Sequence, residues 1–97
     1  MATYIVLLDF TDQGIRNLED SPQRADAFNA FAEKAGVKIV GQYWTIGSHD
    51  GVLLIDAPDE ERAASVLLHL GMSGNVRTTT LRAYDWAQAQ ELIASEG

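Results

Sequence analysis

The stretch from residue 37 to residue 58 places the strongest constraint on the fold. Two runs rich in β-branched and aromatic residues, 37–46 and 52–57, flank a short polar linker that contains glycines and an Asp-Gly pair. This pattern predicts a β-hairpin, because Gly and Asp tolerate the positive φ angles that a tight reversal needs. The run Val52-Leu53-Leu54-Ile55 is apolar on successive residues, whereas a strand with one wet face alternates. We therefore expect both faces of this hairpin to be covered.

The remaining segments predict helices and strands on either side of the hairpin. Ser21 as N-cap and Pro22 at the first helical position indicate the start of the main first helix, after a break near Ser21. Part of 13–20 is expected to be helical as well. The predicted elements are a strand at 4–10, a helix from Ser21 to Gly36, strands at 37–46 and 52–57, a helix from Pro58 to Gly71, a strand at 76–83 and a last helix capped by Asp85.

Each predicted helix carries an apolar stripe. In the first helix, Phe28 and Phe31 belong to an i, i+3, i+4, i+7 pattern and are expected to be buried. The second helix is expected to bury Ala63, Ala64, Leu67, Leu68 and Leu70, and the last helix to share Trp86, Ala89, Leu92 and Ile93 on one side.

The order β-α-β-β-α-β plus a terminal helix predicts a single α+β domain over residues 1–97, with a ferredoxin-like four-stranded antiparallel sheet. Two helices cover one face of such a sheet, yet the strand at 4–10 is apolar on both faces. A bare face would be a larger apolar patch than monomers usually expose. We therefore expect a homodimer with its sheets face to face, a dimeric α/β barrel. The sequence does not specify whether such dimers assemble further, for example into a hexamer.

Composition excludes several functions. The 97 residues contain seven Lys and Arg against fourteen Asp and Glu, a net charge of −7. Nucleic acid and anionic membranes are therefore not expected as partners. The absence of cysteine excludes disulfides, zinc-thiolate sites and thiol nucleophiles. No apolar run approaches the roughly 20 residues of a membrane span, so we expect a cytoplasmic protein.

Five stretches resemble the GYD domain family of small bacterial and archaeal proteins. They are Tyr4-Ile-Val-Leu-Leu-Asp-Phe-Thr-Asp-Gln-Gly-Ile-Arg-Asn, Ser21-Pro-Gln-Arg-Ala, Tyr43-Trp-Thr-Ile-Gly, Asp56-Ala-Pro-Asp and Gly74-Asn-Val-Arg-Thr. The resemblance implies a ferredoxin-like dimeric α/β barrel and supplies no reaction. The name-giving pattern Gly-x-Tyr-Asp is replaced here by Gly47-Ser48-His49-Asp50, with His in place of Tyr.

His49 and Asp50 are the first candidates for chemistry. An imidazole beside a carboxylate can act as a general acid or base. Adjacent strand residues point to opposite faces, however, so the alternative is that Asp50 bonds backbone N–H groups of the turn while His49 is exposed. We expect this turn to lie at a subunit contact or a pocket mouth. His69 is expected to be solvated, and two histidines without a third ligand specify neither a metal site nor a cofactor.

Four further residues are candidates for ligand binding. Tyr43 and Trp44 point to opposite faces of one strand, where each ring either packs or stacks on a ligand. The strand at 76–83 places Arg82 with Thr78 and Thr80 on one face, and Arg77 with Thr79 and Leu81 on the other. A cationic face beside apolar walls suits a carboxylate. The alternative is an edge strand kept soluble by polar residues.

Two classes of function fit these observations. One is an oligomeric domain that binds a small molecule or serves assembly. The other is a cofactor-independent enzyme of the dimeric α/β-barrel group, an isomerase, decarboxylase or monooxygenase acting on a small aromatic or carbonyl compound. The second rests on analogy of fold. A cavity of at least about 300 Å³ that contains His49, Tyr43 or Arg82 would favour ligand binding or catalysis, and the catalytic residues themselves stay unknown.

Overall fold

The computed structural model describes residues 1–95, and the last two residues of the predicted domain lie outside the described residues. The elements in chain order are β1 (Ala2–Phe10), α1 (Asp12–Arg16), the short 3-10 helix η1 (Leu18–Asp20), α2 (Ser21–Lys34), β2 (Lys38–Trp44), β3 (Gly51–Ala57), α3 (Glu60–Met72), β4 (Val76–Ala83) and α4 (Trp86–Ser95). The predicted order is confirmed, including helical structure within 13–20 and a break before Ser21.

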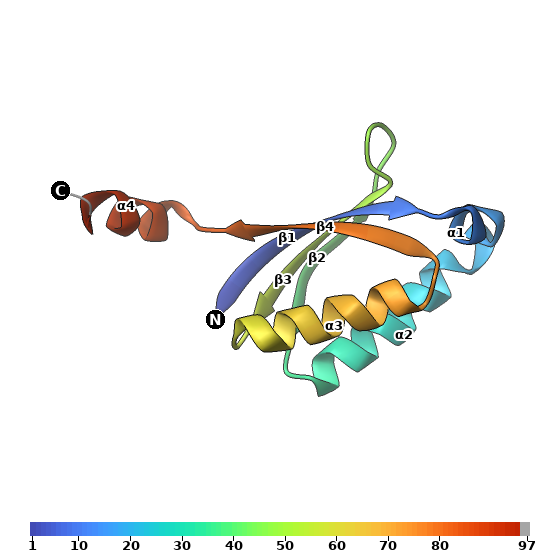
Figure 1. Cartoon of the computed structure of the whole chain (residues 1–97), viewed down its shortest axis with the longest axis horizontal. Coiled ribbons are helices and arrows are strands. Elements are labelled where there is room, and N and C mark those ends of the chain that lie inside the picture. The colour runs from blue at the N-terminus through green and yellow to red at the C-terminus, as the bar shows by residue number, and fades with distance from the viewer. Residues whose placement is uncertain (96–97) are drawn as a thin grey trace.

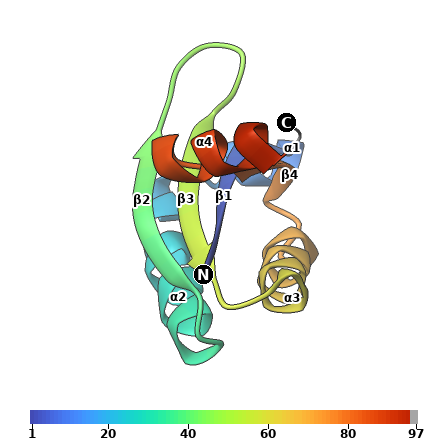
Figure 2. The same cartoon turned by 90° about the vertical axis from the view of Figure 1, so that its left-hand side faces the viewer.

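The four strands form one antiparallel sheet in the order β2-β3-β1-β4. Helices α2 and α3 lie on the same side of this sheet, and the long loop between β2 and β3 rises on the other side (Figure 1). Figure 2 shows the strands side by side, with α2 partly behind β2 and α3 at the lower right, below β4. This is the ferredoxin-like α+β arrangement that the sequence predicts.

The sheet face without helices, called the open face below, is apolar at its centre and charged at its ends. Strand register and alternating burial assign to it Thr3, Ile5, Leu7 and Asp9 of β1, Val52, Leu54 and Asp56 of β3, Lys38, Gly41 and Tyr43 of β2, and Arg77, Thr79 and Leu81 of β4. Its charges occur in opposed pairs across neighbouring strands, Asp9 with Arg77 and Asp56 with Lys38. Opposite charges at such positions attract each other.

The hydrophobic core lies between the other sheet face and the two helices. Its buried apolar members are Tyr4, Val6, Phe28, Ala32, Val37, Leu53, Ile55, Ala57, Ala63 and Val66. Phe28 is buried as predicted, whereas Phe31 is only partly buried at the edge of the core. In α3 the inner face differs from the prediction, because Val66 is fully buried while Leu68 is 70% exposed and Ala64 is exposed. The helical phase that contains Ala63 turns these two residues outward.

Two helix ends differ from the expectation. Ser21 is the first residue of α2 and not its N-cap; Asp20 occupies that position, while Pro22 lies in the first turn as predicted. Helix α3 continues past Gly71 to Met72, and Gly74, with φ +81°, follows the C-cap Ser73. A left-handed glycine after the last turn is the usual helix stop, and Gly74 fills that role in place of Gly71.

Helix α4 extends the molecule beyond the edge of the sheet (Figure 1). The radius of gyration is 14.6 Å and the longest extent is 51 Å, whereas a compact domain of this length has a radius of gyration of about 12.5 Å. Trp86 and Ile93 of α4 are 78% and 75% exposed. Its N-cap follows the prediction, since Asp85 Oδ1 accepts the N–H of Gln88 at 2.8 Å. Within residues 1–95, no helix has the length and apolar character needed to cross a membrane.

Candidate functional site

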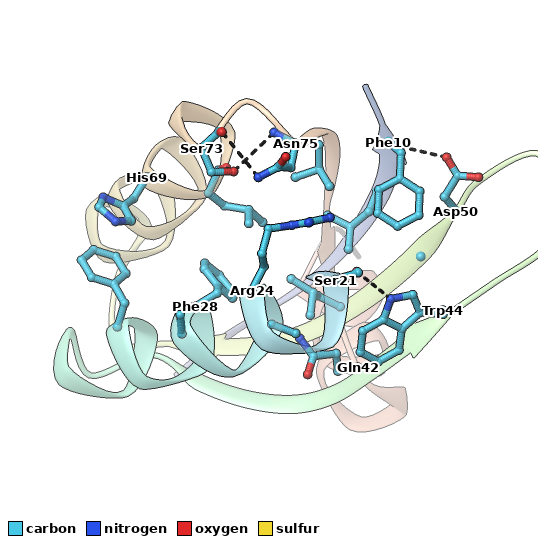
Figure 3. A pocket seen from close by; sticks show the side chains of 18 of the residues that line it. Phe10, Ser21, Arg24, Phe28, Gln42, Trp44, Asp50, His69, Ser73 and Asn75 are labelled. Carbon is cyan, nitrogen blue, oxygen red and sulfur yellow. Dashed lines mark hydrogen bonds between the residues drawn. The ribbon is translucent and has the colours of Figure 1, made fainter. Parts of the chain in front are cut away.

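A cavity of about 490 Å³ opens between α2, α3 and the core-side face of the sheet. Leu8 and Phe10 of β1 and Phe28 of α2 supply apolar walls, and Trp44 and Asp50 lie at the side toward the β2–β3 loop (Figure 3). The volume lies in the range of small-molecule sites, which are concave, mainly apolar and carry few polar groups. Tyr43 also borders the cavity, but its ring lies on the open face, next to Gly41. The cavity exceeds the volume of about 300 Å³ set out above, but of the three residues named with it only Tyr43 borders the cavity, and neither His49 nor Arg82 does.

One end of the cavity is formed by the loop Ser73–Asn75, which α1 holds in place. The N–H of Thr11 donates to the carbonyl of Asn75 at 3.1 Å, and Thr11 Oγ1 donates to the carbonyl of Gly74 at 2.6 Å. Gln13 Nε2 donates to the Ser73 carbonyl at 3.2 Å and to Asn75 Oδ1 at 3.1 Å. Residues sixty positions apart in the sequence therefore fix this end of the cavity together.

Two polar groups of α2 lie on the cavity wall. The Oγ of Ser21, a buried residue, accepts a hydrogen bond from Trp44 Nε1 at 3.0 Å, which fixes the indole against the start of the helix (Figure 3). Arg24 extends across the cavity from the same helix (Figure 3). Its Nη1 donates to the carbonyl of Asn17 at 2.7 Å, and its Nη2 lies 3.5 Å from the carbonyl of Gly14.

The end of the cavity away from Trp44 carries an aromatic pair. The rings of Phe31 on α2 and His69 on α3 stack with centroids 3.9 Å apart and planes inclined by 14°. His69 is exposed, as the sequence analysis expected, but it packs against a neighbour instead of standing free in solvent. Both residues line the cavity, so His69 adds a polar nitrogen-containing ring at its rim.

The structure separates His49 from Asp50. Asp50 Oδ2 accepts the backbone N–H of Phe10 at 2.9 Å, and the Asp50 N–H donates to the carbonyl of Leu8 at 2.8 Å. His49 lies near a different acid, with Nδ1 3.2 Å from Asp9 Oδ1. The two neighbours therefore do not form an acid–base pair. The Asp50 carboxylate accepts a backbone hydrogen bond, as in the alternative given above, but the donor is the Phe10 N–H of β1 and not an N–H group of the turn.

Asp50 is expected to act as a hydrogen-bond acceptor that fastens the hairpin to β1. Asp50→Ala should lower the free energy of unfolding by about 1–3 kcal/mol, because the Phe10 N–H loses its acceptor. Asp50→Asn keeps a side-chain oxygen in the same place and should lower it by less than half as much. Urea unfolding of the two variants at matched protein concentration measures the difference. Equal losses for both variants would show that the negative charge matters and not the acceptor.

The two candidate arginines of β4 lie on opposite faces, as predicted from the alternation. Arg77 is on the open face, opposite Asp9. Arg82 is on the helix side, where its guanidinium carbon lies 5.5 Å from the ring centroid of Tyr4 and 4.3 Å from that of Tyr84. It borders a shallow hollow between α3 and β4, separate from the 490 Å³ cavity. A guanidinium over aromatic faces gains a cation–π attraction.

The six candidate residues therefore occupy three places. Trp44 and Asp50 line the cavity, and Tyr43 borders it with its ring on the open face. His49 and Arg77 flank Asp9 at the open face. Arg82 lies between Tyr4 and Tyr84. Sequence reasoning missed Arg24, Ser21 and the Phe31–His69 stack as parts of a site. The spacing of Ser21, Arg24 and Phe28 at i, i+3 and i+7 on one helix was the available signal.

Comparison with known proteins identifies the family. A family model described as "GYD domain" matches residues 4–93. A protein of Thermus thermophilus, named "Glutamine synthetase and cystathionine beta-lyase binding protein", is 39% identical over 84 residues, which are 86% of this chain and 88% of that protein. No solved structure gave a significant match. The family match spans β1 to α4, so it covers the cavity and the open face alike. This chain therefore belongs to the GYD domain family.

Proposed function

We propose that this chain is a binding protein that pairs with a second copy of itself through the open face and, as a dimer, binds metabolic enzymes. The observation that carries the proposal is the name of the Thermus thermophilus relative, a protein that binds glutamine synthetase and cystathionine beta-lyase. Partly exposed apolar side chains on the open face and exposed ones on α4 support it, because exposed apolar patches mark protein–protein contacts.

The charge of the open face favours a second copy as its occupant, and its area supplies a large part of an interface. Strands of seven to nine residues, at about 3.3 Å per residue and 4.8 Å between strands, give a flat area on the order of 500 Å² before side-chain relief is counted. A stable interface buries about 800 Å² on each partner. In a chain of net charge −7, this face pairs Asp9 with Arg77 and Asp56 with Lys38. Because each acidic residue on this face lies opposite a basic one, the face can be buried against the same face of a second copy.

Two projecting segments fit the same assembly. The loop between β2 and β3 rises on the open side of the sheet (Figure 1), and its Ile46 is fully exposed. Helix α4 extends beyond the sheet edge with Trp86 and Ile93 exposed. In the proposed dimer both segments pack on the second copy, which places His49 at a subunit contact. We propose a cytoplasmic location, where such enzymes act.

The partner proposal is tested with purified proteins. Glutamine synthetase and cystathionine β-lyase from the source organism are passed over the immobilised chain by biolayer interferometry, with an unrelated acidic enzyme as control. We expect saturable binding of at least one of the two enzymes and none of the control. Binding of neither enzyme up to about 100 μM, roughly the limit at which a weak specific complex differs from encounter, would refute the proposed partners. Light scattering of the chain alone tests the dimer separately.

A further inference from the structure

The charge of Arg24 is the feature of the cavity that the proposed function does not use. Arg24 is one of the residues that line the mainly apolar cavity, and within residues 1–95 it has no carboxylate within 4.0 Å, since the ion pair found there joins His49 to Asp9. Its polar partners are the backbone carbonyls of Asn17 and Gly14. Arg24 is partly buried, and its bond to the Asn17 carbonyl is exposed to solvent. The guanidinium therefore lies at the border of the cavity, where an anion can pair with it through charge-assisted hydrogen bonds.

Arg24 also keeps donors available. A guanidinium carries five N–H groups in a planar fork, and the two carbonyls engage one group on Nη1 and one on Nη2. These two bonds orient the side chain across the cavity (Figure 3). A positioned guanidinium recognises a carboxylate through two parallel hydrogen bonds, which are stronger than bonds between neutral groups. Arg24 is thus held in place while part of its fork stays free to bind.

The rest of the cavity is suited to an apolar body. Phe10 and Phe28 line its interior, Trp44 stands at one side, and Phe31 stacks with His69 at the other (Figure 3). Its volume of about 490 Å³ exceeds the roughly 150 Å³ of a dry cavity that holds benzene. The space therefore admits an aromatic ring with a short chain attached.

Asp50 does not offset Arg24 as an anion partner. Its Oδ2 is engaged by the Phe10 N–H, and it lies on the Trp44 side of the cavity (Figure 3). From these contacts we infer that the cavity is a binding site for a small carboxylic acid with an aromatic or branched apolar body, whose carboxylate is bound by Arg24. The site lies on the helix-covered side of the sheet and does not depend on the open-face dimer or on the proposed enzyme partners.

A pair of isosteric probes tests the charge requirement without any variant. 3-Phenylpropanoate and 3-phenylpropanamide differ only in the charge of the terminal group, and calorimetry or amide shifts in ¹H–¹⁵N NMR measures their binding. We expect the carboxylate to bind about 10- to 100-fold more tightly, the range that a charge-assisted hydrogen bond produces. Equal affinities, or no binding of either probe at 10 mM, would overturn the inference.

Variants then locate the site. Arg24→Gln should bring the carboxylate down to the affinity of the amide, whereas Arg16→Gln, which removes the same charge from α1 outside the cavity, should leave both affinities unchanged. Ala25→Phe places a ring in the cavity from α2 and should reduce binding of both probes at least tenfold. Binding of the carboxylate should also change the NMR chemical shift of the Trp44 Nε1–H, because Trp44 lines the cavity. A loss in Arg16→Gln equal to that in Arg24→Gln would show a general charge effect and refute the assignment.

Discussion

Gly14→Ala is expected to destabilise the protein by at least about 3 kcal/mol, the upper end of overpacking costs. A Cβ at Gly14 would lie 2.0 Å from the carbonyl oxygen of Asn75 and 2.9 Å from its carbonyl carbon. Both atoms are backbone, so no side-chain rotation relieves the contact. The same oxygen accepts the N–H of Thr11, and moving it away would break the connection between α1 and the loop Ser73–Asn75. For a domain of this size, the melting temperature should fall by about 12 °C or more.

Gly71→Ala is the matched control, because it makes the same chemical change in another helix. Among the described residues 1–95, no atom lies within 4 Å of the position that a Cβ at Gly71 would take. Alanine in a helix is favoured over glycine by about 0.5–1 kcal/mol, so this variant should be neutral or slightly more stable. Thermal unfolding by circular dichroism at one fixed protein concentration compares the two, since association makes stability depend on concentration. A Gly14→Ala variant as stable as the wild type would show that α1 is not clamped to this loop.

Gly14 also connects stability to the cavity. Asn75 lines the cavity, and its carbonyl is the group that a Cβ at Gly14 would displace. If Gly14→Ala folds at low temperature, it should therefore bind 3-phenylpropanoate less tightly than Gly71→Ala does. Because the Gly14 carbonyl also lies 3.5 Å from Arg24 Nη2, a loss of binding would report the loop end of the cavity and the position of Arg24 together.

Local sequence patterns predicted the fold well because each signal acts over a few residues. Gly36 has φ +80° and follows Ala35, the C-cap of α2, as its position after the apolar stripe indicates. Asp59 Oδ1 accepts the N–H of Arg62 at 2.7 Å, in agreement with a helix start after Pro58. The alternation along β4 placed Arg77 and Arg82 on opposite faces, which the register confirms. Strand alternation and helix caps depend on neighbouring residues, so the chain itself displays them.

The candidate site was predicted less well because it depends on contacts between distant segments. His49 and Asp50 are adjacent in the chain, yet they bond to Asp9 and to the Phe10 N–H respectively. Strand β2 ends at Trp44 and β3 begins at Gly51, so a six-residue loop connects them. The alternation of side chains along a strand therefore does not predict where the side chains of this loop point. In the sequence, Arg24 has no feature that distinguishes it from other polar residues of the predicted helix. Only the packing of α2 against the sheet shows that its guanidinium lies in a cavity.

Leu54→Glu is expected to dissociate the proposed dimer, raising its dissociation constant at least about 100-fold, or about 2.7 kcal/mol. Leu54 lies on β3 within the open face and is partly buried in the single chain. A two-fold interface applies each substitution twice, and a carboxylate buried without a partner costs several kcal/mol. In the monomer, the glutamate side chain at position 54 can reach solvent on the open face, so the variant should still fold.

Leu68→Glu separates an interface effect from the effect of added charge. It makes the same substitution on α3, where Leu68 is 70% exposed on the opposite side of the molecule. Sedimentation equilibrium should give a monomer for Leu54→Glu and a dimer for both Leu68→Glu and the wild type, with circular dichroism showing that all three are folded. The cavity should bind 3-phenylpropanoate equally well in the monomeric variant, since Arg24 lies on the other side of the sheet from Leu54. A dimer of unchanged affinity in Leu54→Glu would mean that the open face is not the contact between copies.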